Sequence, residues 1–361
     1  MRKKGKPLPA DHPVHQRVAV TQRLSTSLKS LHYLPSLSVA NRHLQTIVGA
    51  YLPVPRFYRE RQRLELPDGD FLDVDWHDCP SAHGVMIFHG LGGSSESPYV
   101  RALQYRLRAC GWGSVAINLR GASGVPNRLA RAYHAGAGDD VGYAVQAVLR
   151  AARARGVSKG LWHLVGFSLG GSMLVNWWSQ QVSASQLPIG LCVGVSIPLD
   201  LGQCADALNT GAGQLYQHHL LRAVKRYFRH KLAYLMQCGY REAADELKQY
   251  RSCLSARSFW EFDDVYIAPL HGFEHVRDYY ESASPARHLH QGQWPLLIIQ
   301  SEDDPLVPAT GFPELASMPS NVHVKRFRQG GHVGFLNWVN GRLESQLPGL
   351  ITRGLQLAVG L

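Results

Sequence analysis

The sequence predicts an α/β fold with a mostly parallel central sheet, helices on both faces of the sheet and a helical insertion. Short apolar runs such as Val85–Phe88 have the length and composition of strands that are buried on both faces. These runs alternate with segments of helical periodicity, the order expected of parallel strands joined by helices. The 361 residues are 45% hydrophobic and 18% charged, which is enough apolar material for a sizeable core. No stretch approaches the roughly 18 consecutive apolar residues that a membrane span needs.

The first predicted elements form a hairpin. Arg61–Leu66 and Phe71–Trp76 alternate apolar and polar residues on either side of Pro67-Asp68-Gly69-Asp70, a strong turn signal, and therefore predict two antiparallel strands. The later strands are expected at Val85–Phe88, Ser114–Asn118, Leu161–Val165, Leu191–Val195, Pro295–Gln300 and Val322–Phe327.

Four helices are predicted between and after these strands. Ser97-Pro98 supplies a favourable N-cap and first residue for a helix that runs to Cys110 and ends before Gly111. Asp139–Arg155 carries an apolar stripe with helical spacing. The other two helices are expected at Leu169–Gln181 and Leu347–Leu357.

The alternation of strands and helices stops between Pro198 and Pro285, where the residues are helix-forming and rich in Tyr, Leu and His. We interpret this segment as a helical cap over one edge of the sheet. The predicted organisation is a basic N-terminal arm (1–34), the first part of the core (35–197), the cap (198–290) and the second part of the core (291–361).

The chain is basic, with 38 Lys and Arg residues against 27 Asp and Glu residues and a formal net charge of +11. Four basic residues stand within the first six positions, and Asp11 is the only acidic residue before Arg59. We expect a solvated arm, with peripheral contact to an anionic membrane surface as the alternative. No RNA-binding motif or zinc finger accompanies it, which disfavours a nucleic-acid partner. The arm lacks the apolar segment of a signal peptide, so a cytoplasmic protein is expected, although an acid-poor start also suits an organellar transit peptide.

Cysteine and histidine spacing predicts neither disulfides nor a metal site. The six cysteines are widely spaced and form no C-x-x-C pair, which favours reduced thiols. His218-His219 are adjacent, so their side chains point in different directions on a helix, and the chain contains no H-E-x-x-H motif.

The sharpest local feature is Gly166-Phe167-Ser168-Leu169-Gly170, a G-x-S-x-G motif between a predicted strand and a predicted helix. In that context the motif indicates a nucleophile elbow, because so tight a turn leaves room only for glycine beside the serine. The alternative is a glycine-rich turn with an incidental serine.

A serine hydroxyl becomes nucleophilic when a base takes its proton and a third group orients the base. Ser301–Pro308 follows one predicted strand and supplies Asp303 and Asp304, while His332 lies in the loop after the next strand. The order serine, acid, histidine along the chain is the order of the catalytic triad that accompanies a nucleophile elbow on an α/β sheet. We favour Asp304 as the acid, because it stands four residues before Pro308 in a loop of the form D-x-x-V-P, which often surrounds the acid of such a site. Asp303 remains the alternative.

An oxyanion formed by attack on a carbonyl needs two N–H donors. We expect the backbone of Leu169, directly after the serine, and that of Leu91, in the glycine-rich loop His89–Gly93 after an early strand. A phosphate-binding loop is the competing interpretation of these glycines. The chain has no G-x-x-x-x-G-K-[ST] motif and no G-x-G-x-x-G that opens a helix, which disfavours nucleotide binding.

These motifs together resemble the YheT-like (embryogenesis-associated) branch of the α/β-hydrolase superfamily. The resemblance covers about residues 35–345 and implies the α/β-hydrolase fold. It also rests on an N-terminal H-L-Q-T segment and on polar loops that contain Arg120, His134, Asp263 and His271, which we interpret as structural residues. The segments that carry it are Asn41–Thr46, Leu64–Asp70, His89–Tyr99, Asn118–Gly136, Glu261–Asp264, His271–Phe273, Asp278–Tyr280 and Gly330–Phe335.

The expected function is a serine carboxylic ester hydrolase. In it Ser168 attacks the ester, His332 acts as base and then acid, and Asp304 orients the imidazole. The resemblance implies short- to medium-chain acyl esters, of a small molecule or a lipid, and no cofactor or metal. The alternatives are an acyltransferase or phospholipase that uses the same three residues, and a non-catalytic binding module on a hydrolase fold. The sequence predicts no particular oligomeric state.

Overall fold

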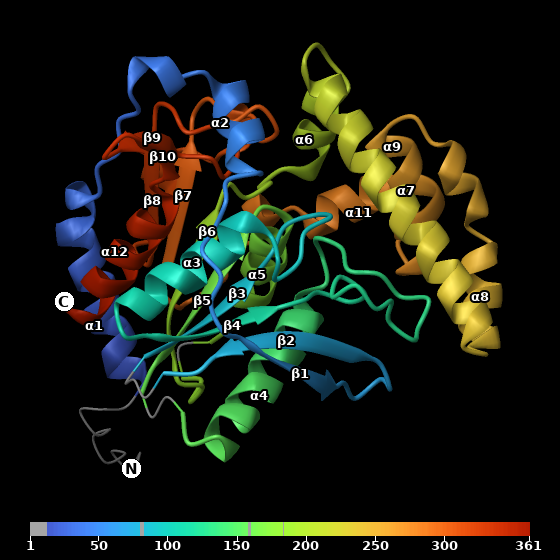
Figure 1. Ribbon diagram of the computed structural model, residues 1–361, viewed down its shortest axis with the longest axis horizontal. Coiled ribbons are helices and arrows are strands. Elements are labelled where there is room, and N and C mark those ends of the chain that lie inside the picture. Colours follow the sequence, from blue (N-terminus) through green and yellow to red (C-terminus); the bar gives the residue numbers. More distant parts are fainter. Residues whose placement is uncertain (1–12, 80–82, 158–159, 183) are drawn as a thin grey trace, which may run out of the picture.

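The computed structural model describes residues 13–79, 83–157, 160–182 and 184–361. Its centre is an eight-stranded sheet with the order β1-β2-β4-β3-β5-β6-β7-β8 (Figure 1). The strands β1 (Glu60–Glu65) and β2 (Phe71–His77) form the predicted hairpin, and β2 also pairs antiparallel with β4. The remaining pairings are parallel, as predicted.

The parallel strands are buried along most of their length, because helices cover both faces of the sheet. Their bounds are β3 Gly84–Phe88, β4 Gly113–Ile117, β5 Trp162–Phe167, β6 Ile189–Val195, β7 Leu296–Ser301 and β8 Val322–Phe327. A separate two-stranded hairpin, β9 (Leu336–Val339) and β10 (Arg342–Ser345), follows β8 and was not predicted. The carboxyl ends of parallel strands lie at one edge of a sheet, where ligands of such folds bind.

Two apolar clusters attach the helices to the two faces. The helices α4 (Gly138–Ala154) and α5 (Leu169–Ser179) pack on one face, against side chains such as Met86 of β3. The helices α3 (Pro98–Ala109) and α12 (Leu347–Val359) pack on the other, against alternate residues of the same strands such as Ile87. Neighbouring residues of a strand therefore point to opposite faces of the sheet and pack in different apolar clusters.

The N-terminal segment differs from the solvated arm that we expected. Its helix α1 (Pro13–Ser27) packs against β6 and α12, and Val20 and Leu24 are buried there. The buried guanidinium of Arg17 donates to backbone carbonyls, including that of Ile189 at 2.9 Å. These contacts bury apolar side chains of a segment whose overall charge had suggested solvent exposure. The basic residues Arg2, Lys3, Lys4 and Lys6 lie outside the described residues.

A second unpredicted helix, α2 (Arg42–Gly49), follows the first. The side chain of Asn41 caps it by accepting hydrogen bonds from the backbone N–H groups of His43 and Leu44.

Between β6 and β7 the chain forms a helical layer with its own apolar cluster, beside the sheet (Figure 1, yellow to orange). It contains the long helix α7 (Gly213–Gln237), which supplies buried Leu221, Phe228 and Leu235 to the cluster. The other elements between β6 and β7 are α6 Leu201–Leu208, α8 Arg241–Lys248, a 3-10 turn at Arg251–Ser255, α9 Phe259–Phe262, a π-helical turn at Asp263–Ile267, α10 Ala268–Leu270, α11 Val276–Ala283 and a 3-10 turn at Pro285–Arg287.

Candidate active site

Ser168 stands in the sharp turn between β5 and α5. Its backbone has φ 49° and ψ −124°, a conformation that is strained for a residue with a side chain. A Cβ at Gly166 would lie 2.6 Å from the carbonyl oxygen of Gly170, and a Cβ at Gly170 would lie 2.3 Å from the carbonyl oxygen of His89. Both glycines of the motif are therefore required by close backbone approach, and the turn presents the serine at the carboxyl edge of the sheet.

His332 and Asp304 lie at the same edge, in the loops after β8 and β7. The Nε2 atom of His332 is 3.0 Å from the Ser168 hydroxyl oxygen, and its Nδ1 atom is 2.9 Å from a carboxylate oxygen of Asp304. An ionised carboxylate can only accept, so the imidazole carries its proton on Nδ1. That leaves the lone pair of Nε2 directed at the serine hydroxyl, which is the arrangement a general base needs.

Of the two aspartates that the sequence left open, Asp304 is the one that contacts the imidazole. Its other oxygen accepts from the backbone N–H groups of Leu306 at 2.9 Å and Val307 at 3.1 Å, which fix the carboxylate in place. Asp303 instead accepts from the backbone N–H of Gly331, at 2.9 Å. Asp303 therefore holds the loop that carries His332 without touching its ring.

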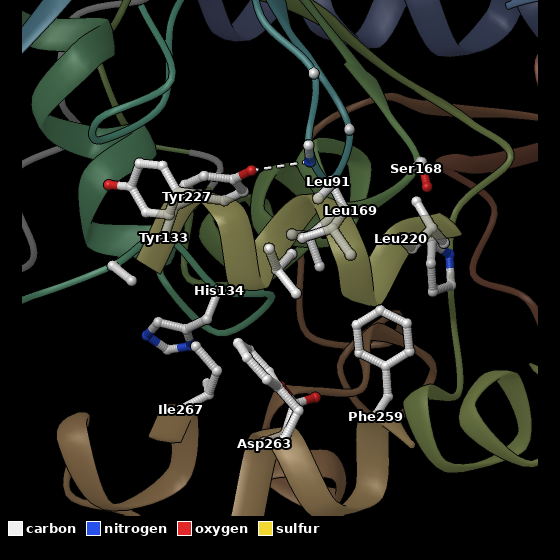
Figure 2. A pocket seen from close by; sticks show the side chains of 18 of the residues that line it. Leu91, Tyr133, His134, Ser168, Leu169, Leu220, Tyr227, Phe259, Asp263 and Ile267 are labelled. Atoms are coloured by element: carbon white, nitrogen blue, oxygen red, sulfur yellow. Dashed lines mark hydrogen bonds between the residues drawn. The ribbon is translucent and has the colours of Figure 1, made fainter. Parts of the chain in front are cut away.

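The glycine-rich loop after β3 lies directly against Ser168. A Cβ at Gly90 would come within 3.0 Å of the Ser168 Cβ. The N–H of Gly90 donates to the hydroxyl of Tyr99 and that of Gly92 to the hydroxyl of Tyr133, each at 3.0 Å. The Gly92 hydrogen bond is the dashed line in Figure 2.

The backbone N–H groups of Leu91 and Leu169 remain available. Within the part of the chain that the structure describes, neither donates a hydrogen bond to another protein group. Leu169 is the first residue of α5, where backbone N–H groups have no acceptor inside the helix and the helix dipole favours negative charge. The two predicted donors thus come from separate loops that meet beside Ser168.

His89 orients this loop. Its Nε2 atom accepts from the backbone N–H of Leu119 at 3.1 Å, so Nδ1 carries the proton and donates to the carbonyl oxygen of Gly90 at 2.8 Å. Burial lowers the pKa of His89 to about 4, which keeps the ring neutral and preserves both hydrogen bonds near neutral pH.

Arg120 belongs to the structural framework, in agreement with its interpretation from the sequence. Its guanidinium is fully buried and pairs with Asp70 at 2.9 Å and with Asp140 at 2.7 Å. Asp70 also accepts from the side chain of Asn127 at 2.6 Å. The network connects the β1–β2 hairpin to the loop after β4 and to the start of α4.

Sequence reasoning missed the part that α2 plays beside His332. The hydroxyl of Thr46 accepts from the backbone N–H of His332 at 2.9 Å and donates to the carbonyl oxygen of Arg42 at 2.8 Å. The neighbouring side chain of Gln45 donates to the carbonyl oxygen of Val39 at 2.6 Å. The H-L-Q-T segment carries part of the family resemblance, but nothing in its local pattern indicates which loop it contacts.

A cavity of about 770 Å³ opens beside Ser168 and His332. Leu91 and Leu169 form one side of it, while Phe259 and Ile267 of the helical layer form the opposite side (Figure 2). Asp263 and His134, which the sequence analysis treated as structural residues, also line it; the other lining side chains include Leu220, Tyr133, Tyr227, Tyr266 and Tyr280. Ser168 therefore faces a largely apolar space of the size that holds a small organic molecule.

Comparison with known proteins identifies the family to which this chain belongs. The profile described as alpha/beta hydrolase fold matches residues 85–337, more than half of the chain. The chain belongs to the α/β-hydrolase family. YheT of Escherichia coli (strain K12) is 33% identical over 347 residues, which cover 91% of this chain and 95% of YheT. The embryogenesis-associated protein EMB8 of Picea glauca is 28% identical over 88% of this chain and 69% of its own length. The predicted fold and the resemblance to the YheT-like branch are thus confirmed.

A solved structure shares the fold of this α/β-hydrolase at lower sequence identity. The Pyrococcus furiosus esterase Pf2001, in space group C2221, is 16% identical and has a TM-score of 0.51, over 83% of this chain and 90% of that one. Among the residues that the structure describes, no helix is both long enough and apolar enough to cross a membrane.

Proposed function

We propose that this α/β-hydrolase is a serine carboxylic ester hydrolase that acts on short- to medium-chain acyl esters. The observation that carries the proposal is the continuous hydrogen-bonded series from Asp304 through His332 to Ser168, at the mouth of an apolar cavity. The relative YheT of Escherichia coli is named as a candidate esterase, which agrees with this reaction class.

The first half of the reaction acylates the enzyme. The Ser168 oxygen attacks the ester carbonyl carbon while His332 Nε2 takes the hydroxyl proton. The carbonyl oxygen becomes an oxyanion, to which the N–H groups of Leu91 and Leu169 donate. When the tetrahedral intermediate collapses, the bond to the alkoxy group breaks, and that group leaves as the alcohol with the proton from His332. Asp304 stabilises the imidazolium that exists in between.

The second half releases the acid. Water attacks the acyl carbonyl, gives a proton to His332 Nε2 and forms a second oxyanion at the same donors. Collapse of this intermediate breaks the bond to the Ser168 oxygen, which recovers the proton from His332. The carboxylic acid then leaves, Ser168 and His332 are restored, and each turnover consumes one ester molecule and one water molecule.

The cavity supports an acyl group of limited length. Its walls are mainly apolar side chains from both the sheet edge and the helical layer, so transfer of an alkyl chain from water into it is favourable, by about 0.8 kcal/mol per methylene group. Its volume of about 770 Å³ is in the range of sites for small organic ligands.

Hydrolysis of p-nitrophenyl esters from acetate to palmitate by the wild type and by Ser168→Ala tests the proposal. We expect turnover with an optimum at short or medium chain length, and a loss of at least roughly 10³-fold in the variant. A fluorophosphonate should label the wild type and not Ser168→Ala, with circular dichroism as the control for folding. A wild type that hydrolyses no ester of the series and is not labelled would contradict the proposal.

A further inference from the structure

Among the described residues that line the cavity, Asp263 is the only one with a carboxyl group, and it has no part in the proposed reaction. The basic side chains of the lining are His134, Arg226, His230 and the proposed base His332. Asp263 begins the π-helical turn Asp263–Ile267, between α9 and α10. Figure 2 shows its side chain with Phe259 and Ile267 on the wall opposite Leu91 and Leu169. Single π-helical turns are rare and occur frequently at functional sites, because they redirect side chains that a regular helix would place elsewhere.

The hydrogen bonding of Asp263 is incomplete. Its Oδ2 atom accepts from the hydroxyl of Tyr280 at 2.8 Å. Among the described residues no other donor bonds to the carboxyl group, and no Lys, Arg or His forms an ion pair with it. Burial raises the pKa of Asp263 to about 7, since no cation offsets the loss of water.

This environment is unfavourable for a plain alkyl chain. Such a chain would displace water from the cavity and leave the second carboxyl oxygen without a partner, at a cost of about 1–3 kcal/mol for a buried polar group. A hydroxyl on the chain would supply the missing hydrogen bond. It suits the carboxyl group in both protonation states, because a hydroxyl both donates and accepts.

We propose that Asp263 is a specificity residue that binds a hydroxyl on the acyl chain, so that the preferred substrates are esters of hydroxylated acids. This inference rests on the proposed ester hydrolysis and adds to it the chemical class of the acyl group. Because Asp263 lies across the cavity from the oxyanion donors, the hydroxyl belongs away from the ester carbonyl.

The experiment compares matched methyl esters, with the released acid titrated. The pairs are hexanoate with 6-hydroxyhexanoate, octanoate with 8-hydroxyoctanoate, and decanoate with 10-hydroxydecanoate. The enzymes are the wild type, Asp263→Leu, Asp263→Asn and the control Asp264→Asn. Asp264 is the exposed neighbour whose carboxylate accepts from the backbone N–H of Val276 and does not line the cavity.

For the wild type we expect kcat/KM to be at least about 10-fold higher for the hydroxylated member of one or more pairs, the scale of one hydrogen bond to a buried polar group. Asp263→Leu should reverse that preference by improving the plain ester. Asp263→Asn, which keeps an accepting oxygen, should retain most of the preference, and Asp264→Asn should match the wild type.

The two hypotheses fail in different ways. Equal kcat/KM for both members of every pair, unchanged in Asp263→Leu, would overturn the role of Asp263 and leave ester hydrolysis intact. A wild type that hydrolyses none of the six esters and is not labelled at Ser168 would overturn both.

Discussion

Replacing Thr46 with valine removes the hydroxyl that accepts a hydrogen bond from the backbone N–H of His332, and we expect the turnover number to fall. The side chains have nearly the same shape, so the helix α2 should pack as before. Thr46 does not line the cavity, so KM should change little. Because its hydroxyl holds the backbone N–H of His332, we expect Thr46 to position the imidazole, and its loss should therefore affect kcat.

The size of the effect follows from the burial of this contact. The donor and acceptor are 2.9 Å apart, and Thr46 is only 9% exposed, so water cannot easily replace the hydroxyl. A buried donor left without a partner costs about 1–3 kcal/mol. If the loop of His332 relaxes to recover that energy, the Nε2–Ser168 geometry is lost in the transition state. At 1.36 kcal/mol per factor of ten, kcat should fall about 5- to 160-fold.

The assay measures kcat and KM separately on the preferred ester for the wild type, Thr46→Val and Thr46→Ser. Serine keeps the hydroxyl and should restore most of the turnover. Urea unfolding of each variant distinguishes a positioning effect from a loss of folded protein. A Thr46→Val enzyme with kcat within twofold of the wild type, or a Thr46→Ser enzyme as slow as Thr46→Val, would refute the reasoning.

Three further predictions follow from the buried polar groups. Asp304→Asn should lower kcat by roughly 10³- to 10⁴-fold, whereas Asp303→Asn should lower it by less than about 10-fold, because only Asp304 contacts the imidazole. Equal losses of kcat in the two variants would contradict the assignment of Asp304 as the acid of the triad. Arg120→Leu leaves buried carboxylates without their cation and should lower the free energy of unfolding by about 3–5 kcal/mol. The control Arg153→Leu, at an exposed position, should lower it by less than about 0.5 kcal/mol. A similarly small loss in both variants would show that the network contributes little. Burial lowers the pKa of His163 to about 3, so below pH 6.5 the unfolded state binds a proton that the folded state does not, and stability falls as the pH falls. His163→Leu should therefore lose about 2 kcal/mol less than the wild type between pH 7.5 and pH 5 in urea unfolding; identical pH dependence would argue against a neutral buried ring.

The sequence alone determined the features that depend on short stretches of chain. The sharp turn at Ser168 follows from the glycines on either side of it, because close backbone approach excludes any Cβ there. Buried parallel strands are short apolar runs, so their positions and the helices between them were predicted closely. Since parallel strands end at the same edge of a sheet, the positions of Asp304 and His332 after two such strands also indicated that they would meet Ser168.

The tertiary structure decided what depends on contacts between distant segments. Asp303 and Asp304 are adjacent and chemically identical, and only the packing of two loops directs one to the imidazole and the other to the backbone of Gly331. Val20 and Leu24 were hidden within a basic segment, yet they anchor α1 to the core. The contact of Thr46 with His332 spans most of the chain, and the direction of Asp263 depends on a π-helical turn. No local pattern encodes such contacts, because burial and side-chain direction are set by whichever element packs against the residue.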